Sequence, residues 1–295
     1  MSRDPQREAR LIEKKIAGLR GRGFFPKELL DLIEEAMRLQ RDASEHVHIP
    51  EISREVLAPA DTTVQGAPLL VRERFIYDED NVNTLFDELL ALALRSWGPL
   101  ADGANHISSA LASGRLVKRD IFSAYLTADE TFFAPWRHEL DNAPMLLDFL
   151  AETSLVPSLA ACAAKVAVHI PTEHEWNYGH CPVCGQHPLI ADLRGKEGQR
   201  YLTCSFCRHE YRAKRLACVF CGEEKTEKLQ YFSSKDEPGY QVHVCESCKH
   251  YLKTADFREY DRSSIPVLDD LESLTLDILA RNKGYGRPTL SAWGF

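Results

Sequence analysis

Apolar residues in the first 170 positions recur with the spacing of amphipathic helices. Between Pro26 and Gln40 they return every three or four residues, with charged residues at the positions between them. That period places the apolar side chains on one stripe of a helix. The helix predicted over residues 144–168 is expected to bend or split at Pro157, because proline cannot donate the backbone hydrogen bond there. The same pattern predicts further helices over residues 83–97, 100–112, 115–125 and 144–168.

Two stretches of this region need separate interpretation. Residues 41–80 have no clean period and contain three prolines, so we expect a long connection there. Residues 143–170 are rich in leucine, alanine and valine, but they carry Asp148, Glu152 and Lys165. A membrane-spanning helix needs about 20 nearly uncharged apolar residues. We therefore interpret this stretch as a buried, kinked helix pair and expect no membrane insertion.

The pattern changes after residue 171. Aromatic and β-branched residues predict short strands over residues 200–203, 228–232 and 240–244. After Pro266, leucines and isoleucines at helical spacing predict a final helix. Its first turn is expected to contain three acidic residues, because the positive end of the helix dipole favours them. These are Asp269, Asp270 and Glu272.

The composition is that of a folded globular protein. The chain has 295 residues, of which 44% are hydrophobic and 27% are charged. The net charge is −8, but residues 180–260 hold 13 Lys and Arg against 11 Asp and Glu, which leaves 23 against 33 elsewhere. Because an acidic body repels a polyanion, nucleic acid is not an expected partner.

Cysteine carries the chemistry. Two thiolates separated by two residues can both turn inward on one tight loop and supply half of a tetrahedral four-sulfur shell. The matching order along the chain suggests that pairs one and two hold one metal ion and pairs three and four another, although a cross-braced grouping also fits the spacing. Eight of the nine cysteines form four such pairs, Cys181/Cys184, Cys204/Cys207, Cys218/Cys221 and Cys245/Cys248.

Disulfides and a redox dithiol are the competing interpretations. Disulfides persist in oxidising compartments, and the N-terminal residues contain no apolar export segment, so we expect a cytoplasmic protein with reduced thiols. A thioredoxin-type dithiol usually occurs as a single pair, not as four in a row. The ninth cysteine, Cys162, is expected to be a buried small hydrophobe.

Residues next to the pairs have predictable roles. Gly185 and Gly222 each follow a second ligand, where a chain that turns around a metal needs a residue tolerant of positive φ. Such turns occur in zinc ribbons and in rubredoxins, and four thiolates suit zinc and iron equally. Three histidines are expected to hydrogen-bond to the sulfurs rather than to bind metal, His180, His209 and His250.

The expected fold class is therefore α+β. An N-terminal all-α domain is followed by two small rubredoxin-like or zinc-ribbon-like metal-binding β modules and a C-terminal helix. The expected boundaries are 1–170 for the helical domain, 171–215 and 216–262 for the first and second tetracysteine ribbons, and 263–295 for the C-terminal helix and tail.

The sequence argues against an enzyme. It has no nucleotide-binding glycine motif, hydrolase elbow or His-Glu-x-x-His motif, and a closed four-cysteine shell leaves no open position for substrate. We predict no catalytic or cofactor-binding residue, although iron sites could still transfer electrons. The alternative is a tandem zinc-ribbon protein that binds nucleic acid or has a regulatory role, because a run of basic residues separates the second and third cysteine pairs. The basic run consists of Arg208, Arg212, Lys214 and Arg215.

Several motifs of the C-terminal half together resemble a known family. They are Cys-Pro-Val-Cys-Gly at 181–185, Arg-Tyr-Leu-Thr-Cys-Ser-Phe-Cys at 200–207, Tyr-Leu-Lys-Thr at 251–254 and Asp-Asp-Leu-Glu-Ser-Leu-Thr-Leu-Asp at 269–277. The chain resembles the FdhE proteins, accessory factors for formate dehydrogenase formation, over about residues 175–287. It departs from them at Tyr211, where the family commonly has tryptophan.

The resemblance implies a cytoplasmic maturation factor and not a dehydrogenase. FdhE-like proteins are thought to contact the catalytic subunit of formate dehydrogenase before its export and to support its activity. Their Cys-x-x-Cys motifs are thought to hold rubredoxin-like iron. Carried over to this chain, the eight paired cysteines would hold two metal ions, iron being favoured over zinc, and the partner would be the formate dehydrogenase catalytic subunit.

Overall fold

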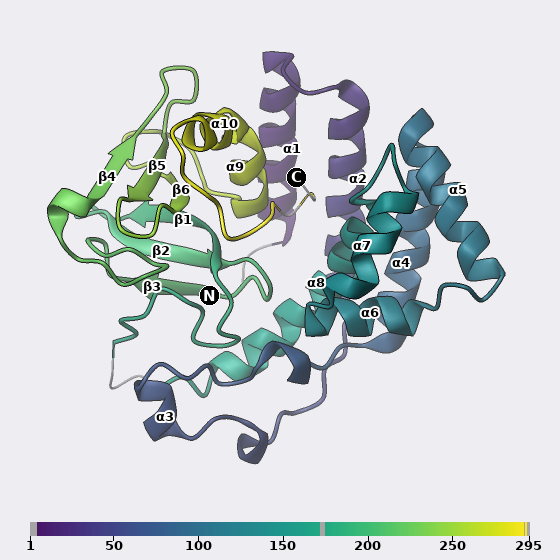
Figure 1. Ribbon diagram of the computed structural model, residues 1–295, viewed down its shortest axis with the longest axis horizontal. Coiled ribbons are helices and arrows are strands. Elements are labelled where there is room, and N and C mark those ends of the chain that lie inside the picture. The colour runs from purple at the N-terminus through teal and green to yellow at the C-terminus, as the bar shows by residue number, and fades with distance from the viewer. Residues whose placement is uncertain (1–4, 172–174, 292, 294–295) are drawn as a thin grey trace. The chain divides into compact units, whose positions relative to one another are not determined.

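The computed structural model describes residues 5–171, 175–291 and 293. These residues form two compact units (Figure 1). The first contains the described residues up to Glu51, then Arg72–Cys162 and Trp293. The second contains Ile52–Val71 and the described residues from Ala163 to Ser291. The division into four segments at residues 170, 215 and 262 stays a prediction.

The first unit is helical, as the apolar period predicted. The sequence analysis missed α1 and α7, although Ile12, Ile16 and Leu19 of α1 are buried and have helical spacing. In α7 the signal is weaker, because this short helix contains Pro135. The helices are α1 (Pro5–Arg22), α2 (Lys27–Ser44), α4 (Glu79–Leu94), α5 (Gly98–Ala112), α6 (Lys118–Thr127), α7 (Glu130–Glu139) and α8 (Leu146–Ala167), with a 3-10 turn at Arg72–Arg74.

Helix α8 does not split at its proline, contrary to the prediction. Pro157 lies inside one continuous helix, where its missing N–H leaves the carbonyl of Thr153 without the usual backbone donor. The side chain of Gln40 supplies that donor, because its Nε2 lies 2.9 Å from Thr153 O. A hydrogen bond from α2 therefore compensates for the proline in α8.

The same helix is the one span among the described residues that is long and apolar enough to cross a membrane. Of its most apolar stretch, 72% is buried inside the protein. The core helix of a water-soluble domain passes the same test of length and composition. Cys162 is fully buried in this helix, as predicted.

The second unit is built on one mixed sheet of six strands, in the order β3-β2-β1-β6-β5-β4. Each tetracysteine region contributes an antiparallel three-stranded meander, and the parallel pairing of β1 with β6 joins the two. The sequence analysis found β2, β4 and β5 but missed the other three strands. The bounds are β1 (Pro188–Arg194), β2 (Gln199–Cys204), β3 (Glu210–Ala213), β4 (Leu229–Phe232), β5 (Tyr240–Cys245) and β6 (Tyr251–Ala255).

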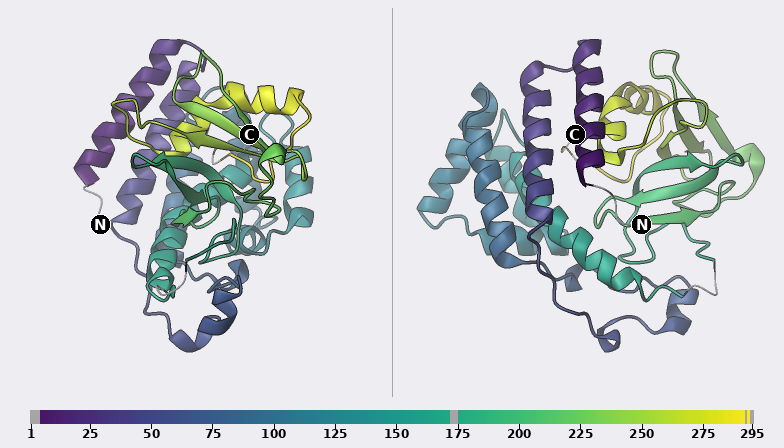
Figure 2. Two further views of the ribbon diagram at one scale, coloured as in Figure 1. Left: turned by 90° about the vertical axis from the view of Figure 1, so that its left-hand side faces the viewer. Right: turned by 180° about the vertical axis from the view of Figure 1, so that it is seen from behind.

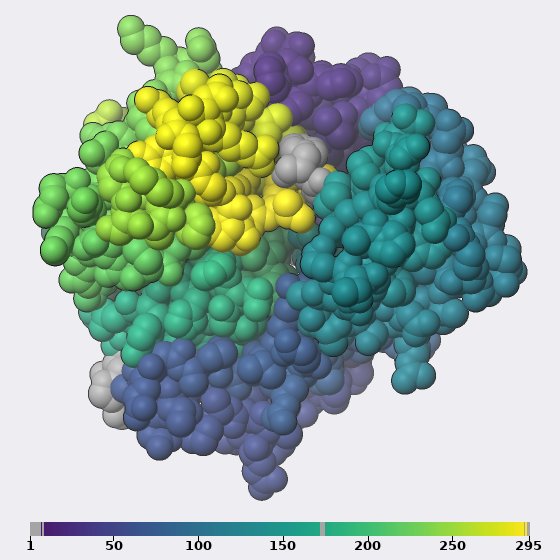
Figure 3. All heavy atoms as spheres, in the orientation of Figure 1, coloured from purple at the N-terminus to yellow at the C-terminus, as the bar shows by residue number. Residues whose placement is uncertain are grey.

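Two helices cover one face of this sheet (Figures 2 and 3). Helix α9 (Pro266–Glu272) packs on β1, and α10 (Leu274–Asn282) packs on β5 and β6. Alternate side chains of β5 face α10, because successive residues of a strand point to opposite faces. The resulting apolar core contains Tyr240, Val242, Val244, Tyr251, Ala255, Leu276 and Ala280.

The predicted final helix is thus two helices, interrupted at Ser273. The hydroxyl of Ser273 donates to Asp269 O at 2.7 Å, and the backbone there leaves helical geometry. Asp269 does lie near the start of α9, where it accepts from the Ile265 N–H at 2.7 Å. However, the three predicted acidic residues are all buried, so the dipole of an exposed helix end does not explain them.

These acidic residues belong to buried charge clusters between the helices and the sheet. Lys253 of β6 is 1% exposed, and its Nζ lies 2.9 Å from Asp270 Oδ1 and also contacts Asp277. Arg287 Nη2 lies 2.6 Å from the same Asp270 oxygen. We call Lys253, Asp270, Asp277 and Arg287 the buried ionic network. A charge buried this deeply is tolerated only when it is paired, so the network fixes how α9 and α10 sit on the sheet.

The remaining segment of this unit, Ile52–Val71, comes from far upstream in the sequence. It holds a 3-10 turn at Arg54–Val56 and the short helix α3 (Ala60–Val64), and is otherwise irregular, as the prolines predicted. A second 3-10 turn, at Thr226–Lys228, precedes β4.

Replacing Gln40 with alanine is expected to lower the free energy of unfolding by about 1–3 kcal/mol, because the buried Thr153 carbonyl loses its donor. The loss should shrink in a Pro157→Ala background, where the helix supplies the donor again. Asn105→Ala is the control: its amide donates to Ala101 O at 2.9 Å on an exposed face, so a change within about 0.5 kcal/mol is expected. Denaturant unfolding followed by circular dichroism measures the free energy of unfolding of the wild type, the three single variants and the double variant. An equal loss in both backgrounds would contradict the compensation.

Lys253→Met is expected to destabilise the protein by about 3–5 kcal/mol, because two buried carboxylates lose their shared cation. Burial acts to raise the pKa of Asp270, but Lys253 and Arg287 hold it below its usual value. A carboxyl with a lowered pKa stabilises the fold above its unfolded pKa and loses that effect as the pH falls through the folded one. The difference in the free energy of unfolding between the wild type and the variant should therefore become smaller in acid. The exposed Lys249→Met serves as control, and a difference independent of pH would count against the network.

Candidate metal centres

The structure gathers the eight paired cysteines into two groups of four. In each group the four sulfur atoms lie within 4.8 Å of one another. Cluster 1 consists of Cys181, Cys184, Cys204 and Cys207, and cluster 2 of Cys218, Cys221, Cys245 and Cys248. This is the sequential grouping of pairs, not the cross-braced one.

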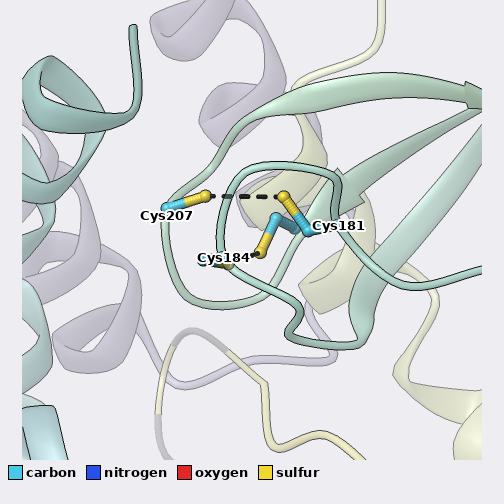
Figure 4. A group of neighbouring side chains, drawn as sticks. Cys181, Cys184 and Cys207 are labelled. Atoms are coloured by element: carbon cyan, nitrogen blue, oxygen red, sulfur yellow. Dashed lines mark hydrogen bonds between the residues drawn. The ribbon is translucent and has the colours of Figure 1, made fainter. Parts of the chain in front are cut away.

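The sulfur separations fit an ion better than they fit disulfides. In cluster 1 the Sγ atoms of Cys181 and Cys207 are 3.8 Å apart and point toward each other (Figure 4), and those of Cys184 and Cys204 are 3.3 Å apart. The corresponding two distances in cluster 2 are both 3.7 Å. A disulfide bond measures about 2.05 Å, whereas a tetrahedron with metal–sulfur bonds of about 2.3 Å has sulfurs about 3.8 Å apart. Both groups therefore have the spacing of a four-thiolate metal site.

The first pair of each cluster lies on a tight turn closed by backbone hydrogen bonds. Gly185 N donates to Cys181 O at 2.8 Å, and Gly222 N donates to Cys218 O at 3.0 Å. These glycines have φ of 76° and 74°, as the sequence analysis predicted. The chain turns in the same way at the second pair of each cluster, although no glycine follows it there. The residues that follow, Arg208 and Lys249, also have a left-handed backbone conformation, each with φ of 58°.

Strands place the second pair of each cluster. Cys204 is the last residue of β2 and Cys245 the last of β5. Each of these cysteines donates its backbone N–H to the carbonyl of a histidine five residues on, His209 at 2.9 Å and His250 at 3.0 Å. The ring of His180 has its Nε2 2.9 Å from Gly66 O. The ring of His180 thus contacts a backbone carbonyl, and His209 and His250 contribute their own backbone carbonyls, so none of these three contacts is the predicted hydrogen bond from a histidine ring to sulfur.

The electrostatics of the clusters call for a cation. Burial raises the pKa of the Cys181 and Cys207 thiols well above the usual value and that of Cys218 to about 11. Burial acts in the same direction on Cys204, but hydrogen bonds with the other three thiols of cluster 1 hold the pKa of Cys204 well below the usual value. A divalent or trivalent ion reverses the effect of burial, because it binds thiolates and displaces their protons. Four sulfurs without a competing oxygen ligand suit zinc or iron and are poor ligands for magnesium or calcium.

The two clusters differ in their exposure. All four cysteines of cluster 1 are buried, whereas Cys221 of cluster 2 is exposed and Cys248 is half-buried. The upstream segment contributes to this cover: Leu69 N and Leu70 N each donate, at 2.9 Å, to the carbonyls of Pro182 and Val183. The sequence analysis did not anticipate this contact, since no residue type in 52–71 marks it. Cluster 1 is therefore the more enclosed site.

A close backbone contact ties cluster 2 to the chain that enters cluster 1. A Cβ at Gly179 would lie 1.9 Å from Val219 O, so only glycine fits there. The buried Tyr211 donates its hydroxyl to Gly179 O at 2.8 Å. The turn between Cys218 and Cys221 thus rests on the segment that precedes Cys181.

Metal removal is expected to occur in two phases. In zinc-loaded protein, a chelating dye should take one equivalent from cluster 2 about tenfold faster than the other from cluster 1, because the cover around a site slows ligand exchange. Cys221→Ser should change only the fast phase, and the matched Cys184→Ser only the slow phase. Absorbance of the dye complex reports both. A single phase, or one phase that responds to both variants, would contradict the difference in enclosure.

Comparisons with known proteins agree with this geometry. Residues 180–215 match the family model "FdhE, central domain", and residues 216–292 match "FdhE, C-terminal domain". The two matched regions meet between residues 215 and 216, so each contains one cluster.

Similar individual proteins are also named FdhE. A Protein FdhE homolog from Aquifex aeolicus is 35% identical over 144 residues, which are 48% of this chain and 49% of that protein. Protein FdhE from Escherichia coli K12 is 34% identical over 139 residues, 45% of this chain and 44% of the relative. In both cases the chain matches about half of the relative's length.

One solved structure has the same fold over the full chain. The crystal structure of the FdhE protein from Pseudomonas aeruginosa superposes with a TM-score of 0.67, at 24% identity, over 100% of this chain and 98% of that one. The helical first unit therefore belongs to the shared fold. Residues 180–292, a region that includes both clusters, are thus similar to the central and C-terminal domains of the FdhE proteins.

Proposed function

We propose that this protein is a cytoplasmic accessory factor for the formation of formate dehydrogenase. It acts by binding the catalytic subunit of that enzyme, and it carries two metal ions on its eight paired cysteines. The observation that supports this most is that each FdhE domain match contains one complete four-sulfur cluster. The protein itself is not a dehydrogenase in this proposal, since a closed four-thiolate shell has no open position for substrate.

Iron is the proposed metal, by resemblance to the FdhE proteins. Iron in four thiolates can change oxidation state without changing its ligands, whereas zinc cannot. The clusters supply suitable surroundings, because backbone N–H groups approach the sulfurs; Phe220 N lies 3.5 Å from Cys218 Sγ. Such donors stabilise the electron-rich thiolates of an occupied site.

The tandem-ribbon alternative, in which the basic run binds nucleic acid, has less support. Two of its four cations already contact acidic side chains, since Lys214 Nζ lies 2.8 Å from Glu224 and Arg212 lies 3.6 Å from Glu175. These pairs are exposed and weak. They nevertheless lower the positive charge that a polyanion would meet, on a chain whose net charge is −8.

Complementation tests the proposal. In bacterial cells that lack their own FdhE protein, the intact chain should restore formate-dependent dye reduction and should retain the formate dehydrogenase catalytic subunit in a pull-down. The pair Cys181→Ser and Cys184→Ser should abolish both, because cluster 1 loses half of its ligands. Cys162→Ala, which alters a buried cysteine outside the clusters, should leave both intact.

Analysis of the freshly isolated protein identifies the metal. Two equivalents of iron with a visible absorption band that dithionite bleaches are expected. Zinc instead would remove the iron part of the proposal and leave the client part standing. Failure to restore activity, together with a pull-down that contains nucleic acid but no catalytic subunit, would overturn the proposal in favour of the tandem-ribbon alternative.

A further inference from the structure

The face of the sheet opposite α9 and α10 carries a cavity of about 270 Å³. Its floor is formed by side chains from β1, β2, β4, β5 and β6, and its rim by residues 215–220, which lead into cluster 2. The strand register explains why these side chains share a face, since Leu193 pairs with Arg200 and His243 pairs with both Leu252 and Tyr231. We call this space the arginine cavity.

Arg200 is the unusual group in the lining. It is 5% exposed, and its guanidinium donates to Lys214 O at 3.1 Å, to Ala217 O at 2.8 Å and to His243 Nδ1 at 3.1 Å. Its Nε has no partner. Within the described part of the chain no carboxylate forms an ion pair with it. A buried cation with an unused donor and no carboxylate partner is costly unless an anion approaches it.

Two more guanidinium groups converge near the same space. A Cβ built on Gly198 would lie 2.7 Å from Arg258 Nη1 and 2.8 Å from Arg215 Nη1, so these two side chains meet over one glycine. Arg258 pairs with Asp256, with Nε 2.7 Å from Oδ1. Arg215 donates to the backbone carbonyl of Glu197. Among the described residues, Asp256 is the single carboxylate in the lining, set against three arginines.

The rest of the lining is apolar. Leucine side chains from three strands and the rim, together with Phe220, cover most of the surface, and Gln230 and Gln241 add amide groups. Arg200 donates to His243 Nδ1, so that nitrogen is unprotonated, and His243 adds no charge. A cationic end and an apolar remainder are the features of a site for an amphipathic anion.

We propose that the arginine cavity binds a small organic anion, in which a carboxylate or phosphate group is attached to an apolar body. The anionic group lies at the end of the cavity lined by Arg200 and Arg215, and the apolar body lies against the leucines and Phe220. This assignment does not depend on the identity of the client protein.

Calorimetric titration of the metal-loaded full chain tests the proposal. Benzoate and phenyl phosphate are the anionic probes, and benzyl alcohol is the neutral probe of similar shape. We expect saturable binding of at least one anion with one site per chain, and no saturation with benzyl alcohol. The anion that binds more tightly identifies the group as carboxylate or phosphate.

Arg215→Gln is the diagnostic variant, because this exposed residue can lose its charge without leaving a buried gap. It should weaken anion binding about tenfold, since a charge-assisted contact is lost. Arg212→Gln removes the same charge from β3, outside the cavity, and should change binding less than about twofold.

Three results would each overturn the proposal. The first is no saturation with either anion up to about 10 mM, a concentration at which a specific site of this kind should be filled. The second is equal weakening by Arg212→Gln and Arg215→Gln, which would indicate general attraction to a basic surface. The third is equal binding of benzyl alcohol, which would indicate an apolar cavity without anion recognition.

Discussion

The close approach of four sulfur atoms in each cluster is the constraint on which the structure of the second unit depends. Four thiolates at these separations repel one another, so a cluster of them is stable only around a cation. The left-handed residues after each pair, the strand ends at Cys204 and Cys245 and the glycine contact at Val219 all serve to hold sulfur at that spacing. The face of the sheet that packs on α10 carries an apolar core. Metal ions held by the two clusters would therefore add to the stability of this unit.

The two faces of the sheet treat buried charge in opposite ways. On the helix face, Lys253 and Arg287 meet two carboxylates, and the charges balance within the protein. On the other face, Arg200 is equally well buried but donates to neutral acceptors. Paired buried charges fix one packing arrangement, whereas a buried cation without a carboxylate partner is stabilised when an anionic ligand binds beside it. The same sheet therefore has one structural face and one face suited to binding.

The sequence predicted local features far better than long-range ones. The spacing of the cysteines predicted both clusters. It also predicted a positive φ at Gly185 and Gly222, because a tight turn that places two cysteines around one ion requires that backbone conformation. The continuity of α8 could not be foreseen, since its explanation lies in Gln40, more than 100 residues away. Nor could the pairing of β1 with β6 or the cover that Leu69 and Leu70 give cluster 1, because both rest on backbone contacts between distant segments.

The parallel pairing of β1 with β6 has a consequence for biosynthesis. As the chain leaves the ribosome, the sulfurs of cluster 1 are complete once Cys207 emerges, yet the edge of β1 stays open until Tyr251–Ala255 has been made. An open edge invites pairing with other chains. Early capture of an ion by cluster 1 would hold the first meander in shape through that interval. With the order that the two clusters have along the chain, metal supplied to the nascent polypeptide and bound as proposed would guard against aggregation.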